Sequence, residues 1–436
     1  MRCLIIFFFI LSQVFPQDRL LSDSSTATAG NSPGGSAVKF KILPFSYYDN
    51  SVGVVLGGLG SIKGFLQQET FAKTGGIVST SGTYYGFLQI ENFQIPQFPR
   101  IFLRPDIYVG KVKDIKLYLN AAKDEYTSPG ANESEQNDYV SMEGNDQWYE
   151  FNVKYLLPIG HGKENAVINP VFNNGILVSG ETGGAGWNPL QSGRTFLETK
   201  FFYRDINLHG GSIKYDKQTL GFEFALSHEN MDYFFNPTEG SFERFAYTVD
   251  WGAAGENNQF NTLKFDYRLF LPLYDKEADE LPFVLAFNFV TMDTPSWNDY
   301  NIITTSGGKE VKVFHRPQLF LSANLGGEKR LRSYPRYRFY DKAMIYYSLE
   351  LRKNLGWNPF NLFSFTRDAG INFIQLGAFL DFGRVAPQWN LKTFHRRMKW
   401  SAGGGVRLFI EGLVVRVDVA GGKEGVLTQM FVDHAF

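Results

Sequence analysis

The 436-residue sequence contains almost no cysteine, since Cys3 is the only one. A single cysteine excludes a fold held by disulfides and a zinc site built from cysteine thiolates. The charge excess is also minimal, with 43 Lys and Arg residues against 44 Asp and Glu residues. A nucleic-acid-binding protein normally carries a strong basic excess, so the composition argues against a nucleic-acid partner.

Long hydrophobic runs are missing as well. No stretch approaches the ~20 apolar residues that a membrane-spanning helix requires. The short apolar run at residues 4–11 follows Met1 and Arg2, which is the pattern of a secretory signal peptide. We therefore expect residues 1–17 to be a signal peptide, with cleavage between Ser12 and Gln17.

Signs of catalysis are equally sparse. The six histidines are scattered, without a His-x-x-x-His pair, and nothing in the sequence brings a serine and a histidine together. We expect no enzymatic activity, no metal site and no cofactor.

What the sequence does contain is alternation of apolar and polar residues. One set of apolar positions is Leu263, Phe265, Tyr267, Leu269 and Leu271, opposed by Lys264, Asp266 and Arg268. Similar patterns fill residues 197–204, 220–226, 345–352, 374–383 and 401–408. A soluble β-sandwich also alternates, but its strands would be short, whereas the strands that contain these segments are expected to run ~9–11 residues, the length that crosses a bilayer. Because only helices and closed barrels satisfy the backbone in lipid, the pattern predicts a transmembrane antiparallel β-barrel of about 16 strands.

This assignment divides the chain into three parts. Residues 1–17 form the signal peptide, residues 18–37 a flexible periplasmic tether rich in Ser, Thr, Ala and Gly, and residues 38–436 the barrel. Residues 41–49 are interpreted as a proline-marked lead to a glycine-rich first strand. Residues 121–147 and 160–193 are predicted to be loops, while the strand boundaries between Leu66 and Pro158 stay open. Alternation would make residues 314–325 a strand, but the strand count places them in a long loop between Thr294 and Lys342.

The segment from Gly326 to Arg352 is the most distinctive part of the sequence. It begins with Gly326-Gly327, continues through Leu331-Arg332-Ser333-Tyr334, and ends in a strand that carries Glu350-Leu351-Arg352. This arrangement resembles the BamA/TamA-like bacterial surface antigen family of outer-membrane barrels, with serine in place of the signature glycine. Phe379-Leu380-Asp381-Phe382-Gly383 and the turn Asn236–Gly240 are similar to further family motifs. Residues 1–37 have no room for the periplasmic POTRA domains that precede many barrels of the family.

The resemblance implies a long loop folded into the barrel lumen, where Arg332 reaches Glu350 and Asp381. Gly326, Gly327, Leu331, Ser333 and Tyr334 would form the rest of this loop motif. The last residues, with Met430, Val432, His434 and Phe436 on one face, resemble a strand whose terminal Phe436 is a C-terminal signal for assembly into the membrane.

The resemblance also implies a location in the bacterial outer membrane, in contact with its lipids. Its members assist the insertion or translocation of other proteins, here together with a possible separate periplasmic POTRA-type or lipoprotein subunit. A passive outer-membrane channel and a structural surface barrel are the alternatives. Conductance measurements, together with a search for bound client proteins, would distinguish them.

Overall fold

The computed structural model describes residues 39–49, 53–67, 70–119, 129–163, 166–168, 170–173, 176–184, 186–253, 259–275, 280–304, 308–362, 371–410 and 413–436. The predicted signal peptide and tether, residues 1–37, lie outside the described residues. No helix in these ranges is long and apolar enough to cross a membrane.

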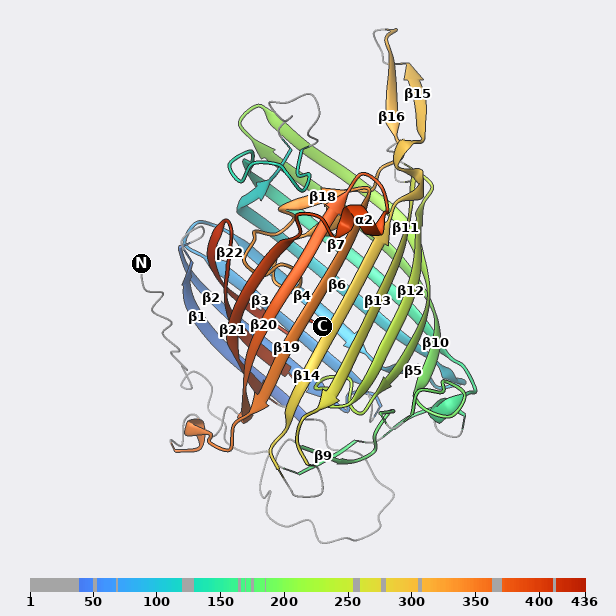
Figure 1. Cartoon of the computed structure of the whole chain (residues 1–436), viewed down its shortest axis with the longest axis vertical. Coiled ribbons are helices and arrows are strands. Elements are labelled where there is room, and N and C mark those ends of the chain that lie inside the picture. The colour runs from blue at the N-terminus through green and yellow to red at the C-terminus, as the bar shows by residue number, and fades with distance from the viewer. Residues whose placement is uncertain are drawn as a thin grey trace.

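One large antiparallel sheet of 17 strand segments makes up most of the fold (Figure 1). Its first half contains β1 (Lys39–Asp49), β2 (Gly53–Lys63), β3 (Phe71–Ser79), β4 (Tyr84–Glu91), β5 (Phe93–Ile95), β6 (Phe98–Leu117), β7 (Val140–Leu156) and β10 (Arg194–Gly210). Its second half contains β11 (Ile213–Met231), β12 (Gly240–Asp250), β13 (Phe260–Pro272), β14 (Phe283–Asp293), β19 (Ala343–Asn354), β20 (Ile371–Ala386), β21 (Lys399–Ile410), β22 (Leu413–Gly422) and β23 (Gly425–Val432).

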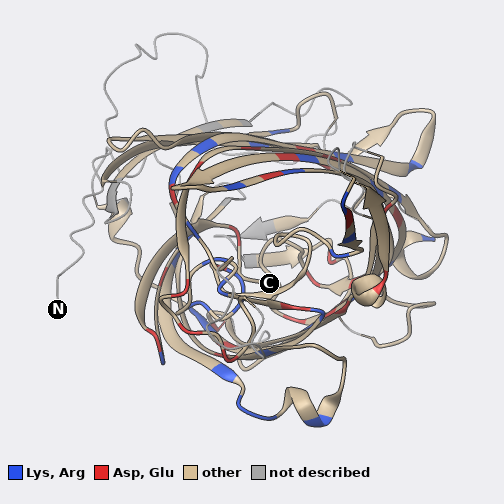
Figure 2. Ribbon diagram, turned by 90° about the horizontal axis from the view of Figure 1, so that it is seen from above, with Lys and Arg blue, Asp and Glu red and all other residues tan. Residues whose placement is uncertain are grey.

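Each strand pairs with the next one along the wall, from β1 to β23. The segments β4 and β5 share the partner β6 and are separated by Asn92 alone, which has a positive φ of 58°. Counting these two segments as one strand turns 17 segments into 16 strands, which confirms the predicted number. The strands wrap around a common axis, and the view along that axis shows the ring that they form (Figure 2).

Side chains alternate between the lumen and the outer face, as the sequence predicts. In β19, Leu349 and Leu351 are 43% and 40% exposed on the outer face. Their neighbours Ser348, Glu350 and Arg352 are at most 1% exposed, because they point inward. The outward apolar band is therefore the lipid-facing surface, and the charged residues line the lumen.

The N-terminal strand corrects one expectation. Residues 41–49 are not a lead to the first strand, because they belong to β1 itself and pair with β2 residue by residue. Proline lacks the N–H that a central strand must donate, so it is confined to edge strands. Pro44 is tolerated here because β1 lies at one end of the strand order, with β2 as its ladder partner.

The predicted loop at residues 121–147 is wrong for its last part, because β7 begins at Val140. A 17-residue strand is longer than the membrane requires, so its outer part rises beyond the lipid and can be polar on both faces. Because both faces are polar there, the sequence shows no alternation of apolar and polar residues, and the start of β7 was predicted to be a loop. The connection at residues 160–193 is confirmed as a loop, and it carries η1 (Gly160–Gly162), β8 (Val171–Asn173) and β9 (Ile176–Ser179).

A long loop joins β14 to β19, as predicted, and residues 314–325 lie within it. The loop contains η2 (Pro295–Asn298), β15 (Tyr300–Thr304), β16 (Glu310–Phe314), β17 (Ala323–Leu325) and β18 (Phe339–Asp341). The β15–β16 hairpin projects above the rim of the barrel, whereas the rest of the loop turns inward (Figure 1). Two short helices, η3 (Pro359–Asn361) and α2 (Leu391–Phe394), lie in the connections that flank β20.

The end of the chain also differs from expectation. β23 ends at Val432, and Asp433 adopts a positive φ of 84°. His434 and Phe436 therefore do not continue the strand face of Met430. The final residues turn into the lumen, where the C-terminus is seen inside the ring (Figure 2).

Candidate functional site

The inward-folded loop is shaped by its paired glycines. Gly326 and Gly327 have φ values of 107° and 104°, a region that residues with a side chain rarely adopt. The Gly326 N–H donates to the Arg330 carbonyl at 3.0 Å, and the Gly327 N–H donates to the Tyr334 carbonyl at 2.9 Å. These bonds close a compact turn that presents Arg332 to the barrel wall.

Arg332 lies at the centre of the lumen-facing network and is 1% exposed. Its Nε and Nη2 donate to the two carboxylate oxygens of Asp381 at 3.1 and 3.0 Å. Its Nη1 donates to Glu350 at 3.0 Å and to Asp418 at 3.3 Å. The guanidinium also stacks on the ring of Phe379, with 3.3 Å between Cζ and the ring centroid. Burial alone would lower the pKa of Arg332, but Asp381 and Glu350 raise it well above its usual value.

The carboxylates that hold Arg332 have further cationic partners. Glu350 accepts from Arg352 Nε at 2.9 Å and also pairs with Arg407. Asp418 accepts from Arg416 at 2.8 Å. Asp381 instead accepts from the hydroxyl groups of Tyr346 and Ser348, at 3.1 and 2.8 Å, and from the backbone N–H of Arg332 at 3.2 Å. Asp381 therefore depends on Arg332 for positive charge more than Glu350 or Asp418 does.

Ser333 occupies the position of the signature glycine without backbone strain, because its φ is not positive. The left-handed position is instead Leu331, with φ 51°. The Ser333 N–H donates to Ser401 Oγ at 3.1 Å, and the two hydroxyl oxygens are 2.7 Å apart. A Cβ added to Gly422 would lie 2.2 Å from Ser333 Oγ, so the absent side chain at Gly422 provides the space that the serine fills.

Arg338 fixes the far side of the loop. It is 0% exposed and forms two bonds of 2.8 Å to the carboxylate of Glu424. It also donates to the side chain and the carbonyl of Ser134, both at 2.8 Å. Arg336 differs, because its side chain is 53% exposed and pairs with Glu328 of the same loop. Arg332 and Arg338 thus join the loop to the rest of the barrel through ion pairs, whereas the ion pair of Arg336 stays within the loop.

The structure brings all the predicted loop residues together and places Phe436 close to them. Arg352, which pairs with Glu350, donates to the Phe436 carbonyl at 3.3 Å. Phe436 is 7% exposed and packs in a cluster with Met231, Phe242 and Phe270. Its side chain is therefore part of the lumen packing, a role that the terminal position alone did not indicate. Its role as an assembly signal stays a prediction.

Sequence reasoning missed several members of the network. Arg338, Arg407, Arg416 and Asp418 were not among the predicted site residues, although Arg407 lies in one of the segments predicted to alternate. These residues could have been predicted as members of the network from one feature of the sequence: they are charged and are expected to face the lumen, where the predicted site residues lie. Among the described residues, no group of three or more His, Cys, Asp and Glu side chains is arranged to hold a metal.

Comparisons with known proteins bear on the family and the fold. The profile of the Omp85 superfamily domain matches residues 193–410, which is half of the chain. Among solved structures, CdiB from Escherichia coli has a TM-score of 0.51 at 12% identity, covering 91% of this chain and 61% of that one. CdiB from Acinetobacter baumannii gives 0.49 at 12%, covering 91% and 60%. BamA from Haemophilus ducreyi lacking POTRA domains 1–3 gives 0.46 at 13%, covering 90% and 70%.

The chain thus spans about three fifths of each CdiB chain. At 12–13% identity the structural matches support the fold and carry no information about function. No curated protein matches the sequence. The profile match over half of the chain decides the family: the protein belongs to the Omp85 superfamily and is a β-barrel of the bacterial outer membrane.

Proposed function

We propose that this barrel assists the insertion or translocation of other proteins at the outer membrane, without enzymatic chemistry of its own. The observation that supports this function best lies at the two ends of the sheet. β1 pairs with β2, and β23 pairs with β22, so in the described part of the chain each end strand has a ladder on one side. An end strand presents backbone N–H and C=O groups that another strand can satisfy.

The end strand β23 is also short, with 8 residues, whereas β6 has 20 and β11 has 19. A ladder between β23 and β1 would have few hydrogen bonds to break, so we expect the wall to open most easily here. An incoming strand that pairs with β1 would gain a backbone template inside the membrane, where unpaired polar groups are costly.

The arginine network contributes by keeping the loop inside the barrel. The loop held in the lumen and the C-terminal residues packed beside it fill part of the space through which solutes would pass. This arrangement favours a function in which other proteins pair with the end strands of the barrel, and it argues against simple diffusion of solutes through the pore. Client delivery would fall to a separate periplasmic POTRA-type or lipoprotein subunit, and no nucleic acid takes part.

The test closes the boundary between β1 and β23 with a disulfide. Because Cys3 is the only natural cysteine, an introduced pair reports on this boundary alone. Leu43→Cys in β1 would be combined in turn with Met430→Cys or Val432→Cys in β23, because these three side chains pack in one cluster. The protein is reconstituted in liposomes, and the folding rate of a urea-denatured eight-stranded barrel is measured by gel mobility.

The unmodified protein should accelerate client folding, the cross-linked form should not, and a reductant should restore the rate. Each single-cysteine variant is the matched control and should behave like the parent. Steady ion conductance without any acceleration of client folding would refute the proposal and favour a passive channel.

A further inference from the structure

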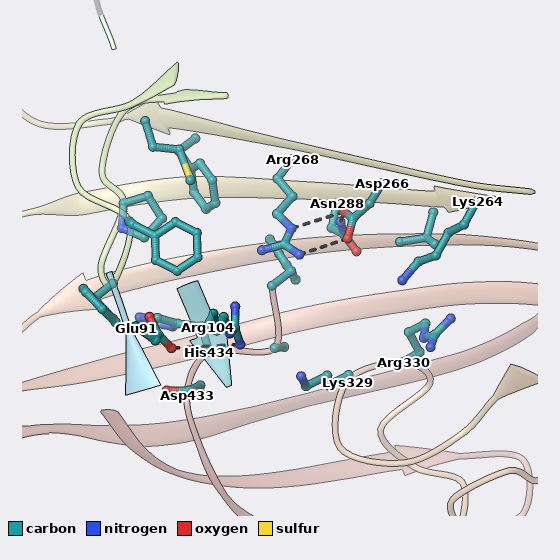
Figure 3. A pocket seen from close by; sticks show the side chains of 18 of the residues that line it. Glu91, Arg104, Lys264, Asp266, Arg268, Asn288, Lys329, Arg330, Asp433 and His434 are labelled. Carbon is teal, nitrogen blue, oxygen red and sulfur yellow. Dashed lines mark hydrogen bonds and ion pairs between the residues drawn. The ribbon is translucent and has the colours of Figure 1, made fainter. Parts of the chain in front are cut away.

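A cavity of about 240 Å³ lies in the lumen between the barrel wall, the long loop and the end of the chain. The wall contributes residues from β3, β4, β6, β11, β13 and β14, and the loop contributes Lys329 and Arg330. Asp433 and the three residues after it form another side. Figure 3 shows the charged side chains that meet there.

The charges that line this cavity are unequal. The cationic side chains are Lys73, Arg104, Lys264, Arg268, Lys329 and Arg330, and the acidic ones are Glu91, Asp266 and Asp433. Six cations therefore face three carboxylates.

Each carboxylate already has a cationic partner from the lining. Lys73 pairs with Asp433 at 2.7 Å and with Glu91 at 3.6 Å. Arg268 pairs with Asp266 at 2.9 Å. Arg104 lies 4.0 Å from Glu91, which completes the pairing of this part of the cavity.

The other three cationic side chains of the cavity have no acidic partner in the described part of the chain. Among the described residues, Lys264, Lys329 and Arg330 have no carboxylate within 4.0 Å of their nitrogen atoms. Their nearest recorded partners are weak, since Arg330 Nη1 lies 3.4 Å from Met344 Sδ and Lys329 Nζ lies 5.6 Å from the ring centroid of Phe431. In Figure 3 Lys264 and Arg330 lie on the right and Lys329 near the middle, whereas Glu91 and Asp433 lie on the left.

We propose that this cavity binds a multiply charged oxyanion of the phosphate type through Lys264, Lys329 and Arg330. A guanidinium presents paired N–H donors that match phosphate oxygens, and the two ammonium groups add point charges. Water occupies about 30 Å³ per molecule in the liquid, so 240 Å³ accommodates one such anion with some of its hydration. Three unpaired cations suit a ligand with more than one negative charge.

The position of the site gives the ligand a structural consequence. Lys264 belongs to β13 in the wall, whereas Lys329 and Arg330 precede Arg332 in the loop. A bound anion would therefore join the loop to the wall at a second place, beside the arginine network. This inference concerns ligand binding and does not depend on the proposed role in protein insertion.

The experiment uses the full chain, folded in neutral detergent, with inorganic pyrophosphate as the probe in a chloride buffer of constant ionic strength. Titration calorimetry should detect saturable binding to one site. Lys264→Gln and Arg330→Gln should each weaken binding about tenfold or more, because a hydrogen bond to a charged group contributes at least that factor. Lys214→Gln, at an exposed position of β11, is the matched control and should bind like the parent.

Gel mobility of the unheated samples establishes that each variant is folded, and Lys264→Arg should keep most of the affinity. No saturable binding by the parent at millimolar pyrophosphate, or equal binding by the parent and the folded glutamine variants, would overturn the proposal. A second arm adds phosphatidic acid to the detergent. Competition with pyrophosphate assigns the site to a phosphorylated lipid headgroup, and no competition assigns it to a free anion; either result supports the oxyanion site.

Discussion

Replacing Arg332 with alanine tests how the loop is held in the lumen. If Arg332 were the only cation beside Glu350 and Asp381, this change would leave both carboxylates without a cationic partner. In the structure only one of the two carboxylates loses all its cationic partners, because Glu350 keeps Arg352 at 2.9 Å together with Arg407. The loss falls on Asp381, which keeps the hydroxyl groups of Tyr346 and Ser348 but no cation among the bonds that it forms.

The size of the effect follows from this difference. Removing one partner of a buried ion pair costs about 3–5 kcal/mol. We expect Arg332→Ala to fall near the lower end, about 3 kcal/mol, because Asp381 retains two hydroxyl donors. Asp381→Asn should cost less, about 1–2 kcal/mol, because Arg332 keeps Glu350 at 3.0 Å and Asp418 at 3.3 Å. The double variant Arg332→Ala/Asp381→Asn should be more stable than Arg332→Ala alone, since it contains no unpaired buried carboxylate.

Three measurements follow the change: the temperature at which the folded gel mobility is lost, the rate of trypsin cleavage in the loop, and conductance in planar bilayers. Arg332→Ala should lower the first and raise the other two. Arg336→Ala is the matched control, because its side chain is 53% exposed and a surface pair contributes only about 0–1 kcal/mol. Equal behaviour of the two alanine variants, or a double variant less stable than Arg332→Ala, would refute the reasoning.

Three further predictions concern the surroundings of the network. Arg338→Ala should release the other side of the loop and lower the temperature of mobility loss by an amount similar to Arg332→Ala, because Glu424 loses two bonds; an unchanged temperature would contradict this anchor. Phe436→Ala should lower the stability of the inserted protein by about 3 kcal/mol, because the missing ring leaves a cavity. The same heating assay measures this loss. An inserted variant as stable as the parent would show that the main role of Phe436 is in recognition during assembly. Burial raises the pKa of Asp341 to about 6, above its value in the unfolded chain. The folded protein therefore binds more protons at this group, and its contribution to the free energy of unfolding should fall as the pH rises from about 4 to 6. Asp341→Asn should make this pH dependence smaller in the same heating assay, and an unchanged pH dependence would be evidence against the prediction.

Much of the barrel could be predicted from the sequence, because the membrane imposes a strict alternation on each strand. Strands such as β13 and β19 follow this pattern along their whole membrane-facing length. The pattern failed where another constraint applied. The polar part of β7 rises beyond the lipid, and β1 contains Pro44, which its edge position permits. Alternation therefore finds a strand only where one face meets lipid.

The candidate site likewise contains residues that the sequence predicted and residues that it did not. Arg332, Glu350 and Asp381 were predicted from a resemblance in local motifs, and the structure brings them together. The contribution of Asp418 and Arg407 was missed, because these residues lie far along the chain and meet the loop only when the wall curves around it. Periodicity shows which face a side chain occupies. It does not show which inward residues from different strands reach the same point.

Ser333 illustrates why a departure from a motif cannot be judged from the motif alone. A glycine at one position of a signature suggests a need for special backbone geometry or for space. Here the backbone at Ser333 is ordinary, and the space is supplied by Gly422, about ninety residues later in the chain. The hydroxyl then gains a partner in Ser401. The substitution is compatible with an inward-folded loop because the opposing wall lacks a side chain where the serine has one, so the pair of positions, and not the loop position by itself, determines whether the loop fits.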